Sequence, residues 1–127
     1  SGVAMWIIPL SVYSTMNVSI PELDMRVRPC GELGRWLFQQ LVDYNNSDAA
    51  AWTYGDGWSL GDCPAVAAAI KPDCGRFRTV PAPIIDPDTV SRFDASRPTV
   101  RLYDTVDSRF TLGDLFAKLA LFAQAQQ

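Results

Sequence analysis

The last segment of the chain, residues 111–125, is the feature that most constrains the fold. Thr111 is a helix-capping residue type and Asp114 follows three positions later, a pattern typical of a helix N-terminus. Within the segment the only charged side chains are Asp114 and Lys118. A helix that is apolar on nearly every side has to be buried on more than one side. Large apolar side chains recur at helical spacing and are expected to line one face: Leu112, Leu115, Phe116, Leu119 and Phe122.

Other segments show the periods of helices and strands. Residues 32–43 predict a second long helix, and Asp62 followed by Pro64 predicts the start of a short helix that ends at residue 70. Asp86 followed by Pro87 predicts a further helical turn, up to residue 93. We therefore predict a single compact α+β domain over residues 1–127, a small, mostly antiparallel sheet packed with two longer and two short helices. Its strands are expected at 3–8, 10–16, 23–27, 76–80 and 99–103.

The chain of 127 residues contains no histidine. Histidine is the usual general base near neutral pH and the commonest zinc ligand, so its absence argues against most hydrolase and zinc chemistry. Residues 57–61 match the nucleophile-elbow pattern G-x-S-x-G, but Ser59 would have no histidine to take its proton. The aspartates at 56, 62, 86 and 88 fit no calcium-binding loop, and each suits a cap or a turn. We predict no catalytic residue, no metal and no cofactor.

Cys63 is the candidate nucleophile that stands out. It lies at the expected start of the short helix, where exposed N–H groups favour a thiolate. The stretch 61–67, Gly-Asp-Cys-Pro-Ala-Val-Ala, resembles the cysteine-bearing helix start of papain-like enzymes, but the strand at 98–103 lacks the histidine that those enzymes need. A degenerate papain-like enzyme is one alternative, and a half-buried cysteine that packs a short helix is the simpler interpretation. The chain has three cysteines, Cys30, Cys63 and Cys74. Because this is an odd number, we expect free thiols in a reducing, cytoplasmic compartment.

Aromatic and arginine side chains suggest another alternative, a small RNA-binding module. Trp52, Tyr54 and Trp58 lie among glycines, where rings can stack on bases or fill a partner's pocket. Arg76 and Arg78 would share one face of a strand and grip phosphates. The net charge of −3 and the pI of about 4.7 argue against binding of nucleic acid through bulk charge. The simpler interpretation is that the tryptophans fold back onto the core.

The excess of apolar helix surface predicts self-association. A domain of this size cannot cover much on both sides of such a helix, so we expect Leu115, Phe116, Leu119 and Phe122 to pair in a homodimer. A well-buried central helix in a monomer is the equal alternative. The longest apolar run, 119–123, is too short to span a bilayer. Because residues 1–10 do not have the pattern of a signal peptide, we expect no membrane partner.

The two ends of the chain carry a family resemblance. Residues 1–5, Ser-Gly-Val-Ala-Met, are typical of a native N-terminus after removal of methionine, and the polar residues 124–127 suggest that a flexible tail follows. With its Ala-, Arg- and Asp-rich composition the chain resembles the small assembly and packaging proteins of double-stranded RNA bacteriophages. That resemblance implies a virion-associated dimer that contacts a larger protein assembly and RNA during capsid assembly and RNA packaging. The leading hypothesis is a non-enzymatic interaction protein.

Overall fold

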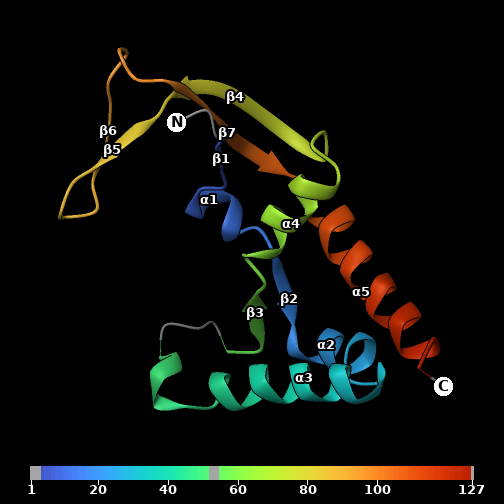
Figure 1. Cartoon of the computed structure of the whole chain (residues 1–127). Coiled ribbons are helices and arrows are strands. Elements are labelled where there is room, and N and C mark those ends of the chain that lie inside the picture. Colours follow the sequence, from blue (N-terminus) through green and yellow to red (C-terminus); the bar gives the residue numbers. More distant parts are fainter. Residues whose placement is uncertain (1–3, 52–54, 127) are drawn as a thin grey trace.

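Two long helices and several short elements alternate along the chain in an α+β fold (Figure 1). The computed structural model describes residues 4–51 and 55–126. The long helices predicted at 32–43 and 111–125 are confirmed as α3 (Gly31–Asn45) and α5 (Ser108–Gln124). The short helix predicted up to residue 70 is also confirmed. The shorter helical elements are α1 (Leu10–Tyr13), α2 (Ile20–Arg26), the 3₁₀ turn η1 (Asp48–Ala50) and α4 (Cys63–Ile70).

The strands of the described residues form three small sheets, mostly antiparallel as predicted. The large sheet has the order β1-β7-β4, with β1 parallel and β4 antiparallel to the central β7. The two smaller sheets are antiparallel pairs, β2 with β3 and β5 with β6. The strands are β1 (Trp6–Ile7), β2 (Asn17–Ser19), β3 (Gly57–Ser59), β4 (Gly75–Pro81), β5 (Pro83–Ile85), β6 (Ser91–Phe93) and β7 (Thr99–Val106).

The strand predicted at 23–27 is wrong, because this segment continues helix α2. The Ser19 hydroxyl caps the helix by accepting a hydrogen bond from the Glu22 amide at 3.2 Å, and a proline lies in the first turn. Leu23 and Val27 are buried four positions apart, on one helical face, whereas Met25 between them is 79% exposed. Three apolar residues at alternate positions therefore do not share a face here.

The strand predicted at 10–16 is also wrong. Pro9 precedes α1, and the amides of Val12 and Tyr13 both donate to its carbonyl oxygen, at 2.9 and 3.1 Å. Val12 and Met16, again four positions apart, are buried on the same side. Pro9 thus follows strand β1 and begins a helical turn, where a second strand was predicted.

The helical turn predicted at 86–93 is a β-hairpin. Strands β5 and β6 pair antiparallel on either side of residues 86–90. The Asp86 amide donates to the Val90 carbonyl (3.1 Å) and the Thr89 amide donates to the Asp86 carbonyl (3.0 Å), as in a three-residue hairpin loop. Aspartate followed by proline suits this turn as well as a helix start, because proline supplies the φ that position i+1 of a type I turn requires.

Helix α5 begins three residues before the predicted cap. The Asp107 carboxylate accepts a hydrogen bond from the Phe110 amide at 2.9 Å and forms the N-cap. Thr111 is buried one turn inside the helix, where its hydroxyl donates to the Asp107 carbonyl at 2.8 Å. The capping role passes to the aspartate, and Thr111 becomes a core position.

The described residues form two separate hydrophobic clusters. The first lies between the large sheet and helices α1 and α4, and the second joins strand β2 with helices α2, α3 and α5. Figure 1 shows the large sheet at one end of the molecule and α3 at the other. The first cluster contains Val12, Met16, Ala67, Ala68, Cys74, Tyr103 and Val106. The second contains Val18, Leu23, Val27, Cys30, Phe38, Phe116 and Leu119.

Candidate interaction surface

One face of the large sheet is covered around Tyr103 by the chain's own helices, whereas Trp6 and Phe77 at the edges of this face are partly exposed. Tyr103 lies on this face, is fully buried, and donates a hydrogen bond from its hydroxyl to the Pro72 carbonyl at 2.9 Å. Val12 and Met16, from α1 and the turn after it, belong to the same cluster as this ring. The buried tyrosine hydroxyl is thus satisfied, as burial of a polar group requires.

Part of the opposite face of the sheet is apolar as well, although Arg78, which pairs with Leu102, also lies on this face because side chains alternate along each strand. The register pairs Ile7 with Leu102 and Val80 with Val100, so these four residues point away from Tyr103. Among the helices of the described residues, α1 is the one in extensive contact with this sheet, through β7. The first hydrophobic cluster places α1 on the Tyr103 side of the sheet. No helix of the described chain is comparably packed on the Leu102 side.

A groove of about 620 Å³ runs along this second face. One wall is the sheet and the segment around β1, and the other is the β5–β6 hairpin, which extends away from the helices in Figure 1. Among the described residues that line the groove, Arg97 alone is charged, and its guanidinium donates to the Pro83 carbonyl at 2.7 Å. We call this the hairpin groove; its main apolar lining residues are Met5, Ile7, Leu10, Ile85, Phe93 and Leu102.

Large apolar side chains of the hairpin groove are exposed to solvent. Leu10 is 75% exposed, and Ile85 and Phe93 are each 58% exposed. Single exposed apolar residues are common on proteins, but a contiguous group on one concave face marks an interaction site. The groove can therefore accept an apolar partner surface.

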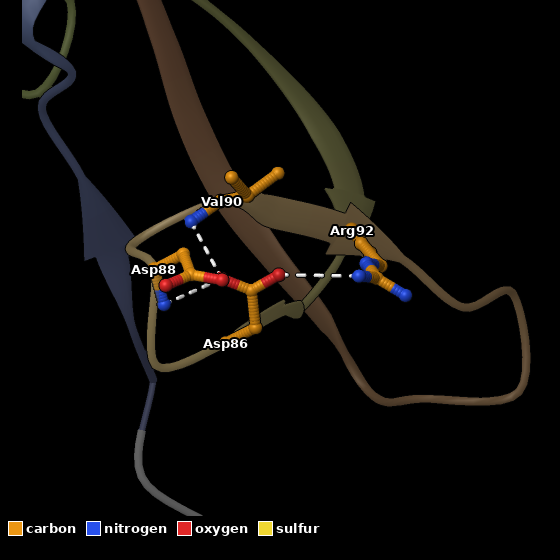
Figure 2. A network of polar contacts seen from close by, with 4 residues as sticks. All are labelled: Asp86, Asp88, Val90 and Arg92. Atoms are coloured by element: carbon orange, nitrogen blue, oxygen red, sulfur yellow. Dashed lines mark hydrogen bonds and ion pairs between the residues drawn. The ribbon is translucent and has the colours of Figure 1, made fainter.

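The hairpin that forms one wall is closed by a network around Asp86 (Figure 2). One carboxylate oxygen accepts hydrogen bonds from the Asp88 amide (3.1 Å) and the Val90 amide (2.8 Å). The other oxygen pairs with the Arg92 guanidinium at 3.2 Å. Thr89 completes the turn at φ = 62°, a left-handed conformation that is unfavourable for a β-branched residue. The hydrogen bonds to Asp86 stabilise the turn in spite of this strain.

The covered face carries an arginine held between two rings at its margin. The Arg101 guanidinium lies 4.2 Å from the centre of the Trp6 ring and 3.9 Å from the centre of the Phe77 ring. These three residues come from β1, β7 and β4, so the stack crosses the whole large sheet. Sequence analysis did not single out this group, because no local spacing connects its members.

Of the residues predicted to bind RNA, those that the structure describes are not brought together. Trp52 and Tyr54 lie outside the described residues. Trp58 lies in β3, where its ring meets Tyr44 edge-on with 5.5 Å between centres. Arg76 and Arg78 lie in β4 of the large sheet, away from β3 in Figure 1, and Arg78 pairs with Asp104 at 3.0 Å. The ring of Trp58 and the two arginines do not form a common site.

The residues predicted to self-associate do not form one exposed surface. Phe116 and Leu119 are buried in the second cluster, where α2 and α3 pack against α5. Leu115 is half-buried, and Phe122 is half-exposed near the end of the helix. The expectation that all four line a surface is thus corrected, because two of them belong to the chain's own core.

The chemistry of Cys63 differs from that of an activated nucleophile. Burial, followed by the negative charge of Asp62, raises the pKa of the thiol. A raised pKa keeps the group protonated at neutral pH, and the thiolate is the reactive form. Cys30, Cys63 and Cys74 are all free thiols, as predicted. In the part of the chain that the structure describes, no three acidic or cysteine side chains converge on a possible metal position.

Comparisons with known proteins identify no relative. No family model matches the chain, and neither the curated proteins nor the solved structures that were searched contain a match. None of the helices in residues 4–51 and 55–126 has both the length and the hydropathy of a membrane span.

Residues of the hairpin groove were missed because the sequence signal was assigned to another element. The segment 83–93 has apolar residues on both sides of Asp-Pro-Asp-Thr, which is a pattern of a hairpin with its turn. Reading the aspartate and proline as a helix start left Ile85 and Phe93 without a role. The pairing of β5 with β6 reveals that both project from one face of the hairpin.

Proposed function

We propose that this chain is a non-enzymatic interaction protein that forms a homodimer through the hairpin groove and acts in a larger assembly. The single observation that carries the proposal is the apolar groove on the open face of the large sheet. Its walls consist of a projecting hairpin and a sheet face on which no helix of the described residues packs extensively. A concave apolar face beside a projecting apolar hairpin is suited to a twofold contact, in which each copy offers both shapes.

The exposed surface area of the chain is larger than expected for a monomer, which supports the presence of a binding partner. A folded monomer of 14.0 kDa is expected to expose about 6,700 Å², but this chain exposes 8577 Å². The excess of about 1,900 Å² exceeds the roughly 800 Å² that each partner buries in a standard interface. A second copy that buried the roughly 800 Å² of a standard interface would remove about two fifths of this excess.

The chemistry of the chain supports a binding role over catalysis. There is no histidine in the sequence, and the pKa of the candidate nucleophile Cys63 is raised. The groove offers apolar side chains and one arginine already bound to a carbonyl oxygen. The resemblance to phage assembly and packaging proteins suggests a capsid as the larger assembly, but the proposal rests on the groove.

Light scattering on a sizing column tests the proposal with two matched variants. Phe93→Asp places a charge in the hairpin groove, and Phe122→Asp places one on α5 at a side chain of similar exposure, 58% against 50%. We expect the native chain and Phe122→Asp to have about twice the mass of 14.0 kDa, and Phe93→Asp to have the mass of one chain. Circular dichroism checks that each variant is folded.

Two results would overturn this proposal. A native chain that stays monomeric at every concentration would remove the dimer. A Phe122→Asp monomer beside a dimeric Phe93→Asp would move the interface to α5.

Addition of a short single-stranded RNA serves as the test of the RNA-binding alternative, for which a mass increase at low salt is expected.

A further inference from the structure

Strand β4 has a free edge along its whole length. It pairs with β7 from Gly75 to Pro81, and in the sheet order β1-β7-β4 no strand of the described residues lies on its other side. Residues 76–79 are exposed. A free edge of this kind presents main-chain hydrogen-bonding groups that another extended segment can use.

The register shows which groups point outward. The Ala82 amide donates to the Pro98 carbonyl (2.9 Å), and the Arg76 amide donates to the Thr105 hydroxyl (3.3 Å), so even-numbered residues of this segment face β7. Because bonding in an antiparallel ladder alternates, Phe77 and Thr79 direct their amides and carbonyls to the free edge. The irregularity in the ladder places the extra residue, Asp104, in β7, which leaves β4 regular.

The charge on this edge is positive and partly unpaired. Arg76 and Arg78 project from one face of β4, and Phe77 and Thr79 project from the other. Arg78 is bound to Asp104, but within the described residues Arg76 forms no ion pair. An added strand would therefore meet two arginines on one face and a half-exposed phenylalanine on the other.

A second copy of β4 is a poor occupant of this edge. Antiparallel pairing about a twofold axis at Phe77 would place Arg76 opposite Arg78 of the other copy, twice. An axis at Arg78 would place the two Arg78 side chains opposite each other. Like charges directly across a strand pair are destabilising, whereas opposite charges stabilise the pair. These two registers disfavour pairing of the edge with its own copy. A third register, with the axis at Thr79, separates the arginines but pairs Phe77 with Pro81, which has no amide to donate.

We propose that the free edge of β4 binds an extended acidic segment of a different protein, which adds to the large sheet as a further strand. The main chain of that segment would bond to the outward groups of Phe77 and Thr79. Its carboxylates, at alternate positions, would face Arg76 and Arg78, and apolar side chains between them would cover Phe77. Residues 76–79 do not line the hairpin groove, although Val80 of the same strand does, so the inference does not require the homodimer.

Fluorescence anisotropy with a labelled, capped peptide of alternating Glu and Val tests the inference. The control peptide has Lys in place of each Glu and the same strand propensity. We expect the Lys peptide to bind the native protein about tenfold more weakly, from two charge pairs that change sign. Arg76→Glu should reduce the difference in affinity between the two peptides. It should leave the oligomeric state of the protein, measured by light scattering, unchanged.

A backbone variant separates strand addition from loose charge attraction. Thr79→Pro removes an amide that points away from β7, so the ladder inside the chain stays intact. Thr79→Val is its matched control, because it keeps the amide and the strand propensity. We expect Thr79→Pro to lose at least about tenfold in affinity for the Glu peptide, and Thr79→Val to bind as the native protein does. Bound peptide should also slow hydrogen exchange at the amides of Phe77 and Thr79.

A modified peptide keeps the test valid if Thr79→Pro proves poorly folded by circular dichroism. N-methylation of the peptide amides that face β4 removes the same hydrogen bonds from the other side, and we expect the same loss. Equal binding of the Glu and Lys peptides, or unchanged binding after N-methylation, would overturn the inference. Failure of the Glu peptide to bind at all would also overturn it, and Arg76 would then only protect the edge from pairing.

Discussion

The two faces of the large sheet are built by the same three strands, yet they differ in what covers them. On one face Tyr103 is fully buried under α1 and its neighbours, and its hydroxyl is bonded to Pro72. On the other face Val80 and Val100 are buried, but the residue adjacent to Tyr103, Leu102, is only half-buried and lines an open groove. The alternation of a strand gives both faces apolar side chains, but a face becomes core only where another element packs on it.

Truncation of these neighbouring residues should have the largest effect that separates the two faces. Tyr103→Ala removes a fully buried ring and is expected to lower the free energy of unfolding by about 3–5 kcal/mol. Leu102→Ala removes a half-buried side chain and is expected to cost about 1 kcal/mol. Urea unfolding, at a dilution at which light scattering shows a monomer, measures both.

Equal losses of unfolding free energy in monomeric Tyr103→Ala and Leu102→Ala would contradict the difference between the two faces, because Leu102 would then belong to a covered core. In the homodimer we expect the cost of Leu102→Ala to increase and that of Tyr103→Ala to stay the same. Unfolding measured over a range of protein concentrations therefore reveals whether the open face is the one that a partner covers.

A smaller effect is expected in the hairpin that forms the wall of the groove. Thr89 adopts a left-handed conformation, and glycine removes the steric strain at this position. We expect Thr89→Gly to stabilise the hairpin by about 1 kcal/mol, which would slow hydrogen exchange of the Val90 amide about fivefold. Thr89→Val retains the branched side chain and should show no such slowing.

The same experiment tests whether the open face is a separate unit. We expect exchange at Tyr103, in the central strand of the sheet, to be unaffected by Thr89→Gly. Equal slowing at Val90 and Tyr103 would contradict the comparison, because the hairpin would then unfold only together with the covered core.

Sequence alone was sufficient for the long helices and for the overall class. Helices α3 and α5 repeat their apolar residues over several turns, and a pattern of that length has one interpretation. The pattern of the short segment 23–27 has two interpretations, because Leu23 and Val27 fit a helical face and also an alternating strand. The local signal that decides between them is the capping hydroxyl of Ser19, which lies outside the alternating residues.

Local sequence patterns could not predict the hairpin groove, because it depends on contacts between residues that are distant in the sequence. Aspartate followed by proline at 86–87 suits a helix start and a turn, and the strand pairing that distinguishes them joins residues on opposite sides of the turn. Which sheet face stays open depends on where α1 packs in space. Phe116 and Leu119 illustrate the same point, because their spacing shows an apolar helix face but not that α2 and α3 cover it.

The smallest effect concerns the loop that returns the hairpin to the sheet. The Ser96 hydroxyl (2.7 Å) and amide (2.9 Å) both donate to Asp94, and with the nearby Arg97 they lower the pKa of its carboxyl group. A carboxyl whose pKa is lowered on folding stabilises the folded state above its unfolded pKa of about 3.9, and this contribution is lost as the pH falls through the lowered value. An NMR titration of Asp94 should have its midpoint below about 3.9, and Ser96→Ala should raise it toward that value. An unchanged midpoint in Ser96→Ala would show that Ser96 does not fix this loop, and the wall of the groove would then depend on Asp86 and its turn.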